Sequence, residues 1–169
     1  MHIDIVDDLN MIIYLQNDRI KNIDFSDKSD LQDYFKDLFV NLKNNYNINI
    51  NGYYYINVHK DKYYGCILEM KKEELDYMEY LDGQVDMNIV IDTNDTFLYE
   101  MNDYFNIDKS LINSVNVYKY NNKIYVKLVN NISNIKMGKL LEFSNIIYGD
   151  KCKKIRKMGN LIEMEKIHI

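Results

Sequence analysis

Apolar and polar residues alternate on both sides of the Asn-Asn pair at 121–122, in the stretch SVNVYKYNNKIYVKLVNN. Asparagine tolerates a positive φ, so this pair predicts the two-residue turn of an antiparallel hairpin. The turn sets a register in which Val117 faces Val126 on an aliphatic face, while Tyr118 faces Tyr125 on an aromatic and basic face. We expect the aliphatic face to be buried and the other face to be wet or to contact a partner.

A helix is predicted after this hairpin, because apolar residues recur there at helical spacing and can cover the aliphatic face. These residues are Met137, Leu140, Leu141, Phe143 and Ile147. Before the hairpin, the pattern predicts a strand over 85–91 and a helix over 97–105. After it, a last strand is expected within 152–164. The second half then has the order β-α-β-β-α-β, which is ferredoxin-like.

The first half predicts two hairpins, over 2–15 and 52–70, on either side of one helix. Ser29 and Gln32 match a capping box at the start of that helix. An apolar stripe then follows on one helical face. Its residues are Leu31, Tyr34, Phe35, Leu38, Phe39 and Leu42. The first half therefore has the order β-β-α-β-β.

The whole chain is expected to have an α+β fold of two small sheet-and-helix units. We place the first unit at 1–72, a short acidic linker at 73–84 and the second, ferredoxin-like unit at 85–169. A hydrophobic share of 47% supplies enough apolar residues for two packed cores. The chain has no proline or alanine but many Asn, Ile, Lys and Tyr residues. This bias indicates AT-rich codon use, so a single tyrosine carries little functional signal.

No apolar run approaches the roughly 18 residues that a membrane-spanning helix needs. Asp4, Asp7 and Asp8 occupy the segment where a signal peptide carries basic and then apolar residues. The two cysteines, Cys66 and Cys152, are too few and too far apart in sequence for a disulfide framework or a CxxC site. We therefore expect a cytoplasmic protein that does not span a membrane.

Candidate catalytic and metal-binding groups are sparse. No glycine-rich phosphate loop occurs. His2 and Asp4 share a strand face and could bind a metal ion, but no third ligand accompanies them. His59 could act as a base for Cys66, but their places in the hairpin do not oppose each other and no orienting group is evident. We predict neither catalysis nor a bound metal ion or cofactor.

Charge is distributed unevenly: residues 1–109 carry a net charge of −12 and residues 110–169 one of +7, for a total of −5. The basic residues cluster in one run, Lys151, Lys153, Lys154, Arg156 and Lys157. We interpret this run first as the protected edge of a sheet and second as a patch for a protein partner. The third interpretation is an RNA platform with Tyr118, Tyr125 and Lys127, because RRM domains share the predicted element order. However, NKIYVKLV lacks the glycine and paired aromatics of their third-strand signature.

Taken in order, the segments of this chain resemble the MecA-type adaptor proteins of low-GC Gram-positive bacteria. In the first half the matching segments are MHIDIVDDLNMIIYL, a loop ending in IDF, DLQDYFKDLFVNL, GYYYINV and YGCILEMKK. In the second half they are VNVYKYNNKIYVKLVN, LLEFSN and KMGNLI. The resemblance rests on the sequential set, which covers 2–72 and 85–163.

The resemblance implies a non-enzymatic adaptor. In this family the N-terminal domain captures client proteins, among them a competence regulator, and the C-terminal domain engages the Hsp100 unfoldase ClpC, which feeds clients to the ClpP protease. Family members usually carry a long acidic linker, which is shortened here to 73–84. We expect residues 1–72 to hold the client and residues 85–169 to bind the unfoldase.

The candidate partner-binding residues, taken from the hairpin pattern and the basic run, are Tyr118, Tyr125, Lys127, Lys154 and Arg156. Tyrosine and arginine are favoured at protein interfaces because they offer large contact areas or forked donors. Two other functions stay open at this point. One is a nucleic-acid-binding, RRM-like module in the basic half, and the other is a purely regulatory protein-interaction domain.

Overall fold

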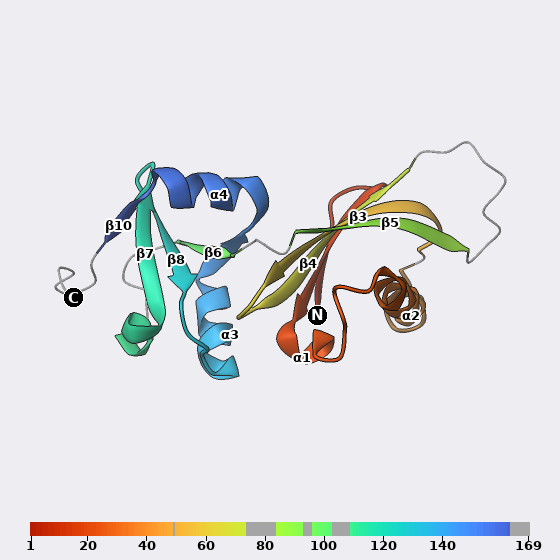
Figure 1. Cartoon of the computed structure of the whole chain (residues 1–169), viewed down its shortest axis with the longest axis horizontal. Helices are drawn as coiled ribbons and strands as arrows, with labels where there is room; N and C mark the ends of the chain where they lie inside the picture. Colours follow the sequence, from red (N-terminus) through yellow and green to blue (C-terminus); the bar gives the residue numbers. More distant parts are fainter. Residues whose placement is uncertain (49, 74–83, 93–95, 103–108, 163–169) are drawn as a thin grey trace. The chain divides into compact units, whose positions relative to one another are not determined.

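The computed structural model describes residues 1–48, 50–73, 84–92, 96–102 and 109–162. The chain divides into two compact units. The first comprises residues 1–60 and 65–92, and the second comprises residues 61–64 and 93–169. Each unit contains a five-stranded sheet and helices, which confirms the predicted α+β class with two sheet-and-helix units (Figure 1).

The sheet of the first unit has the strand order β1-β2-β4-β3-β5. Its strands are β1 (His2–Ile5), β2 (Asn10–Gln16), β3 (Gly52–Asp61), β4 (Gly65–Lys72) and β5 (Val85–Asp92). Both predicted hairpins are confirmed. In the first, Asp7 Oδ1 accepts the N–H groups of Leu9 and Asn10 at 2.8 Å each. Asp7 therefore closes the turn with its own side chain.

One long helix, α2 (Lys28–Tyr46), covers one face of this sheet, and the short helix α1 (Asn17–Ile20) lies in the segment between β2 and α2. The predicted apolar stripe of α2 is buried, apart from Tyr34, which is half-buried. The predicted capping box is wrong, because Asp27 is the N-cap and accepts the Ser29 N–H at 2.8 Å. Asn47 ends the helix with φ 56°, a conformation that asparagine tolerates.

β5 corrects the predicted boundary between the units. The sequence predicts that residues 85–91 open the second unit, but β5 pairs in parallel with β3 from Gly52↔Val85 to His59↔Asp92. The first unit therefore extends to Asp92. A local pattern shows that a segment is a strand but not which strand lies beside it, and β5 skips β4 to reach β3. Most of the predicted linker, residues 74–83, lies outside the described residues.

The sheet of the second unit is antiparallel, with the order β10-β7-β8-β6-β9. Its strands are β6 (Leu98–Met101), β7 (Val115–Tyr120), β8 (Lys123–Leu128), β9 (Ser144–Ile147) and β10 (Asn160–Ile162). The β7–β8 register is confirmed, with Val117 opposite Val126 and Tyr118 opposite Tyr125. Asn121 and Asn122 form the turn with φ 50° and 60°, the positive values expected of this turn type.

Three other elements of the second unit differ from the prediction. Leu98–Met101 is a strand and not the start of a helix over 97–105, of which residues 103–105 lie outside the described part. The last strand expected within 152–164 is present as the short β10 (Asn160–Ile162), but the basic run lies before it on a helix, α4 (Gly149–Met158). Helix α3 (Asn134–Glu142) ends before Phe143 and Ile147. The ferredoxin-like order is therefore wrong for this unit, which also contains the 3-10 helix η2 (Lys109–Ser114).

Helices cover both faces of the second sheet, α3 on one side and α4 on the other (Figure 1). Tyr99 Oη contacts Met137 Sδ of α3 at 4.0 Å. On the opposite face, Cys152 and Ile155 of α4 pack on Tyr125 and Leu98. Leu98, Tyr99 and Met101 are all buried, so β6 lacks the alternation of a half-exposed strand, which explains why Leu98–Met101 resembled a helix.

The second unit includes residues 61–64, the turn that joins β3 to β4. Asp61 is buried, and its carboxylate is fully engaged by backbone groups of this unit. Oδ1 accepts the N–H groups of Tyr63 and Tyr64 at 2.8 Å, and Oδ2 accepts the Phe97 N–H at 3.1 Å. A buried carboxylate is costly unless such donors surround it, so Asp61 ties this turn to residue 97.

Candidate functional site

Among the described residues of the first unit, the helices pack on one face of the sheet and leave the other face without a helix. Both α1 and α2 lie on the first of these faces, where Ile20 and Phe35 join the core. Side chains alternate along a strand, so the residues between the buried ones point to the other side. Tyr55, Asn57 and Glu69 belong to this second set, which we call the open face.

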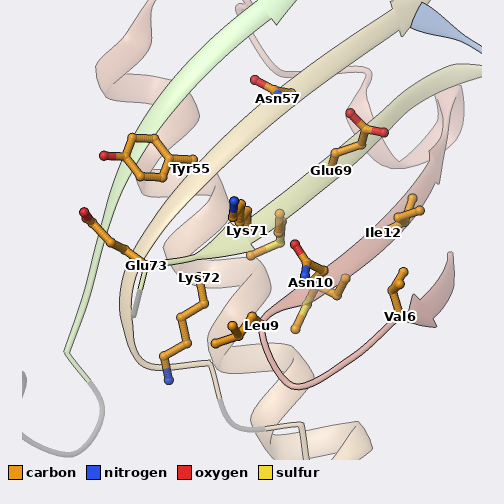
Figure 2. A pocket seen from close by; sticks show the side chains of 12 residues that line it. Val6, Leu9, Asn10, Ile12, Tyr55, Asn57, Glu69, Lys71, Lys72 and Glu73 are labelled. Carbon is orange, nitrogen blue, oxygen red and sulfur yellow. The ribbon is translucent and has the colours of Figure 1, made fainter. Parts of the chain in front are cut away.

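A groove of about 960 Å³ lies on the open face (Figure 2). Its walls come from the β1–β2 turn and from β2, β3 and β4. The lining combines apolar, amide and charged groups. The labelled residues are Val6, Leu9, Asn10, Ile12, Tyr55, Asn57, Glu69, Lys71, Lys72 and Glu73. Such a mixture suits a ligand that offers both apolar and polar groups.

Two of the apolar groups in the groove are strongly exposed. Val6 is 61% exposed and Tyr55 is 44% exposed. The Tyr55 ring is held edge-on against the Tyr53 ring, with the ring centroids 5.4 Å apart. An aromatic side chain that is already ordered loses less entropy when a partner covers it.

Histidine–carboxylate pairs flank the groove on the same face. His59 Nε2 lies 3.0 Å from Glu69 Oε2, and His2 Nε2 lies 2.7 Å from Asp4 Oδ1. Burial, with Asp4 and Glu69 adding negative charge nearby, raises the pKa of Tyr14 to about 12. In the described part of the chain, no three His, Cys, Asp or Glu side chains lie close enough together to hold a metal ion.

His59 and Cys66, which the sequence did not favour as a catalytic pair, lie in different environments. His59 contacts Glu69, as described, while Cys66 is fully buried in the core of the first unit. Burial raises the pKa of the Cys66 thiol to about 12, so it stays protonated and unreactive at neutral pH. Cys152 is also buried and contacts the carbonyl oxygen of Thr96.

The predicted partner-binding tyrosines lie beneath α4. Tyr125 is only 3% exposed and belongs to the cluster formed with Cys152 and Ile155, while Tyr118 is half-buried against the same cluster. The expectation of a wet strand face is therefore wrong for these two residues. Helix α4, which begins 21 residues after the hairpin ends, covers this face of the hairpin. The pattern of residues within the hairpin gives no indication that a later helix packs on it.

A partly exposed ion cluster lies at the edge of this packing. Glu100 lies 2.6 Å from Lys123 Nζ and 3.8 Å from Lys151 Nζ. Burial acts to raise the pKa of Glu100, but hydrogen bonds from Lys123 and Tyr125 and the two lysine charges outweigh it, so the pKa is lowered. Conversely, burial and the bond to Glu100 raise the pKa of Tyr125 to about 12. This cluster anchors α4 and the β8 strand to β6.

The outer side of α4 is strongly basic. Lys154 is exposed, Arg156 is half-buried and Lys127 of β8 is half-buried. The other exposed basic residues of α4 are Lys151, Lys153 and Lys157. The helix buries Cys152 and Ile155, three positions apart, which directs the lysines between them outward. The predicted basic residues thus remain on the surface, but on a helix and apart from the buried Tyr125.

The sequence did not reveal the groove on the open face. The alternation along β3 separates its buried residues from the complementary set Tyr53, Tyr55 and Asn57. The pattern does not show that, in the described part of the chain, helices cover only one side of this sheet.

In the part of the chain that the structure describes, none of the helices is long and apolar enough to cross a membrane. Comparison with models of protein families, with curated proteins and with solved structures finds no match to this chain.

Proposed function

We propose that this chain is a non-enzymatic adaptor that holds client proteins on its first unit and presents them, through its second unit, to an Hsp100 unfoldase of the ClpC type for proteolysis by ClpP. The observation that carries the proposal is the groove on the open face, with exposed Val6 and Tyr55 among polar groups. The resemblance of the ordered segments to MecA-type adaptors supports the choice of unfoldase.

The groove has the make-up of a protein-binding surface. Protein interfaces combine an apolar, aromatic centre with a polar rim, and they are depleted of charge only at the centre. Here Tyr55, Ile12 and Leu9 supply apolar area, while Lys71 and Glu73 supply charged groups. The groove lies on the outer face of a sheet and not inside a core, so side chains of another protein can reach it.

The basic side of α4 supports a role in docking the unfoldase. Lys154 and Arg156 project from a helix that is fixed to the sheet through Ile155 and Tyr125. Charges at the rim of an interface mainly speed association and change its salt dependence. Tyr125 contributes to this surface indirectly, because it supports the helix and does not reach the outside.

An RNA-binding role is less well supported by the same surface. RRM-type recognition stacks bases on aromatic side chains of an exposed sheet. In this unit α4 lies on that sheet face and buries Tyr125. Any nucleic-acid binding by the α4 lysines would then rest on phosphate contacts, which weaken steeply as salt rises.

The test uses the full chain, a purified ClpC-type unfoldase with ClpP, and fluorescein-labelled casein as an unstructured model substrate. The chain should stimulate the unfoldase ATPase and accelerate casein degradation. Lys154→Glu combined with Lys157→Glu should slow association with the unfoldase, whereas Lys109→Glu, an exposed change outside α4, should have little effect.

A second pair of variants tests the groove. Val6→Ser should reduce casein degradation without changing ATPase stimulation, because it removes exposed apolar area from the groove. Ile135→Ser makes the same kind of change at an exposed position of α3 and serves as the control. A chain that neither stimulates the ATPase nor accelerates degradation would refute the proposal.

A further inference from the structure

β5 forms an edge of the first sheet. Among the residues that the structure describes, it pairs with β3 alone, over eight residues without a bulge. The Gly52 N–H donates to the Gln84 carbonyl at 2.9 Å, so the even-numbered residues direct their backbone groups toward β3. The odd-numbered residues Val85, Met87, Ile89 and Ile91 consequently direct theirs away from the sheet.

One outward backbone group has an internal partner. The Met87 N–H donates to Asp86 Oδ1 at 2.8 Å, which agrees with its direction away from β3. The N–H groups of Val85, Ile89 and Ile91 have no such partner within the described part of the chain. Unpaired donors and acceptors along an edge are the template on which a further strand can be added.

A second groove, of about 420 Å³, lies beside this edge, between α2 and the start of β5. Val85 and Ile50 form its apolar side, and Lys36, Val40 and Lys43 of α2 form the other. These three α2 residues are four and three positions apart and therefore share one flank of the helix. Val40 is 57% exposed although it is apolar.

The orientation of α2 explains why this flank faces β5. The opposite flank carries Tyr34, whose Oη donates to the Arg19 carbonyl at 3.2 Å, so that flank faces α1. Phe39, between the flanks, packs on Tyr54 of β3 with ring centroids 6.4 Å apart. Lys36, Val40 and Lys43 therefore extend past β3 to the β5 side.

We propose that an extended segment of the client protein binds here as a sixth strand, paired with β5, with alternate side chains inserted between β5 and α2. The inference rests on the proposed adaptor function and specifies how the client is held. Backbone bonds to an edge supply affinity, and pockets for alternate side chains supply selectivity. The side chains toward α2 should be aliphatic, with an acidic residue beside Lys36 or Lys43. The side chains of the bound segment that point to the open face should be lysine or threonine, because they lie beside Asp86 and Asn88 of β5.

The charges on β5 favour such a segment over a second copy of this chain. A symmetric antiparallel pairing of two β5 strands, centred on Ile89, would place Asp86 of one copy opposite Asp92 of the other. Like charges that face each other across two strands destabilise the pair. A segment with lysine at these positions replaces the repulsion with attraction.

The test measures binding of a labelled peptide of about ten residues to the full chain by fluorescence anisotropy. The peptide alternates lysine or threonine with isoleucine, valine or leucine and ends in glutamate. Val40→Asp should weaken binding about tenfold or more, whereas Asn41→Asp, the same charge change one position along α2, should leave it within about twofold. Amide exchange of Val85, Ile89 and Ile91 should slow when peptide is present.

Two peptides carrying N-methyl groups on alternate residues separate strand addition from simple groove binding. Methylation of the residues whose N–H groups face β5 should abolish binding, and methylation of the other set should not. Equal binding of both peptides, unchanged exchange at the three amides, or no binding at all would overturn the proposal. A dimer in sedimentation that Val40→Asp dissociates would overturn the choice of partner.

The outcome is separable from that of the proposed function. ATPase stimulation depends on α4, so Val40→Asp should retain it. Stimulation by the wild-type chain without peptide binding would refute strand addition alone. Peptide binding without stimulation would refute the unfoldase role and leave strand addition standing.

Discussion

Tyr125, which is buried, and Glu100, which is partly buried, show how a single pair of side chains can make the stability of one unit sensitive to pH. The Tyr125 hydroxyl bonds to the Glu100 carboxylate, which also contacts Lys123 and Lys151. The carboxylate favours the neutral phenol, and burial beneath α4 acts in the same direction. The pKa of this phenol in the folded state is therefore raised from 10.0 to about 12.

This shift predicts a loss of stability at alkaline pH. A folded-state pKa above the unfolded value stabilises the fold fully below pH 10, and the contribution is lost as pH rises toward about 12. Phenylalanine has no proton to lose at this position. The free energy of unfolding of Tyr125→Phe should therefore fall less than that of the wild type between about pH 9 and pH 11.

Urea unfolding at each pH provides the measurement. Tyr46→Phe, which replaces an exposed tyrosine of α2, controls for the loss of one phenol from the chain. Parallel curves for Tyr125→Phe and the wild type would contradict the expected coupling between Tyr125 and Glu100.

Among the elements, α2 is the one on which the first unit depends most directly. It spans 19 residues and buries Leu31, Phe35 and Leu42 against the sheet, while its outer flank borders the groove beside β5. Its start is fixed by Asp27, which bonds the Ser29 N–H and lies at the positive end of the helix dipole. The cap thus determines the residue at which α2 begins, and this start fixes which side chains, Lys36, Val40 and Lys43, lie on the flank beside β5.

Removal of this cap should have a measurable cost. Asp27→Ala should lower the free energy of unfolding by about 1 kcal/mol, the usual value for loss of an N-cap acceptor. Ser29→Ala is the matched control, because the Ser29 side chain is exposed and the cap acts on its backbone N–H. Thermal or urea unfolding of both variants gives the comparison, and an equal loss in the two would contradict the role of the Asp27 side chain as the cap.

The elements that could be predicted are those whose information is local. The β7–β8 register followed from Asn121-Asn122 and from alternation within 14 residues, and the buried stripe of α2 followed from its helical spacing. β5 was recognised as a strand, but its partner β3 lies 33 positions earlier in the chain. The exposure of Tyr125 and the position of the groove could not be predicted, because both depend on contacts between distant segments. Helix α4 covers Tyr125, and the groove lies on the open face of the first sheet.

At the scale of the whole molecule, the place of β5 decides what a stable first unit must contain. Met87 and Ile89 are buried in the core shared with α2. A fragment that ends at residue 84 loses both side chains and leaves β3 as a new edge. A fragment that ends at residue 92 keeps them.

We therefore expect fragment 1–92 to unfold cooperatively and fragment 1–84 to be strongly destabilised. Loss of a buried Met or Ile side chain costs about 2–5 kcal/mol, and a domain has only about 5–15 kcal/mol in total. Circular dichroism melts of the two fragments provide the comparison, and both lack residues 93–169, so they are matched in that respect. Equal transition midpoints would place β5 outside the cooperative unit.

The position of residues 61–64 in the chain affects how the two units can be inherited. These residues belong to the second unit, yet in the sequence they lie between two segments of the first unit, 1–60 and 65–92. A single genetic crossover at any point therefore cannot exchange one complete unit for a homologous one, because residues 61–64 and residues 93–169 of the second unit would come from different parents or would bring residues 65–92 of the first unit with them. Changes in this four-residue turn and changes after residue 93 should consequently be selected together, and the two units should pass through descent as a pair.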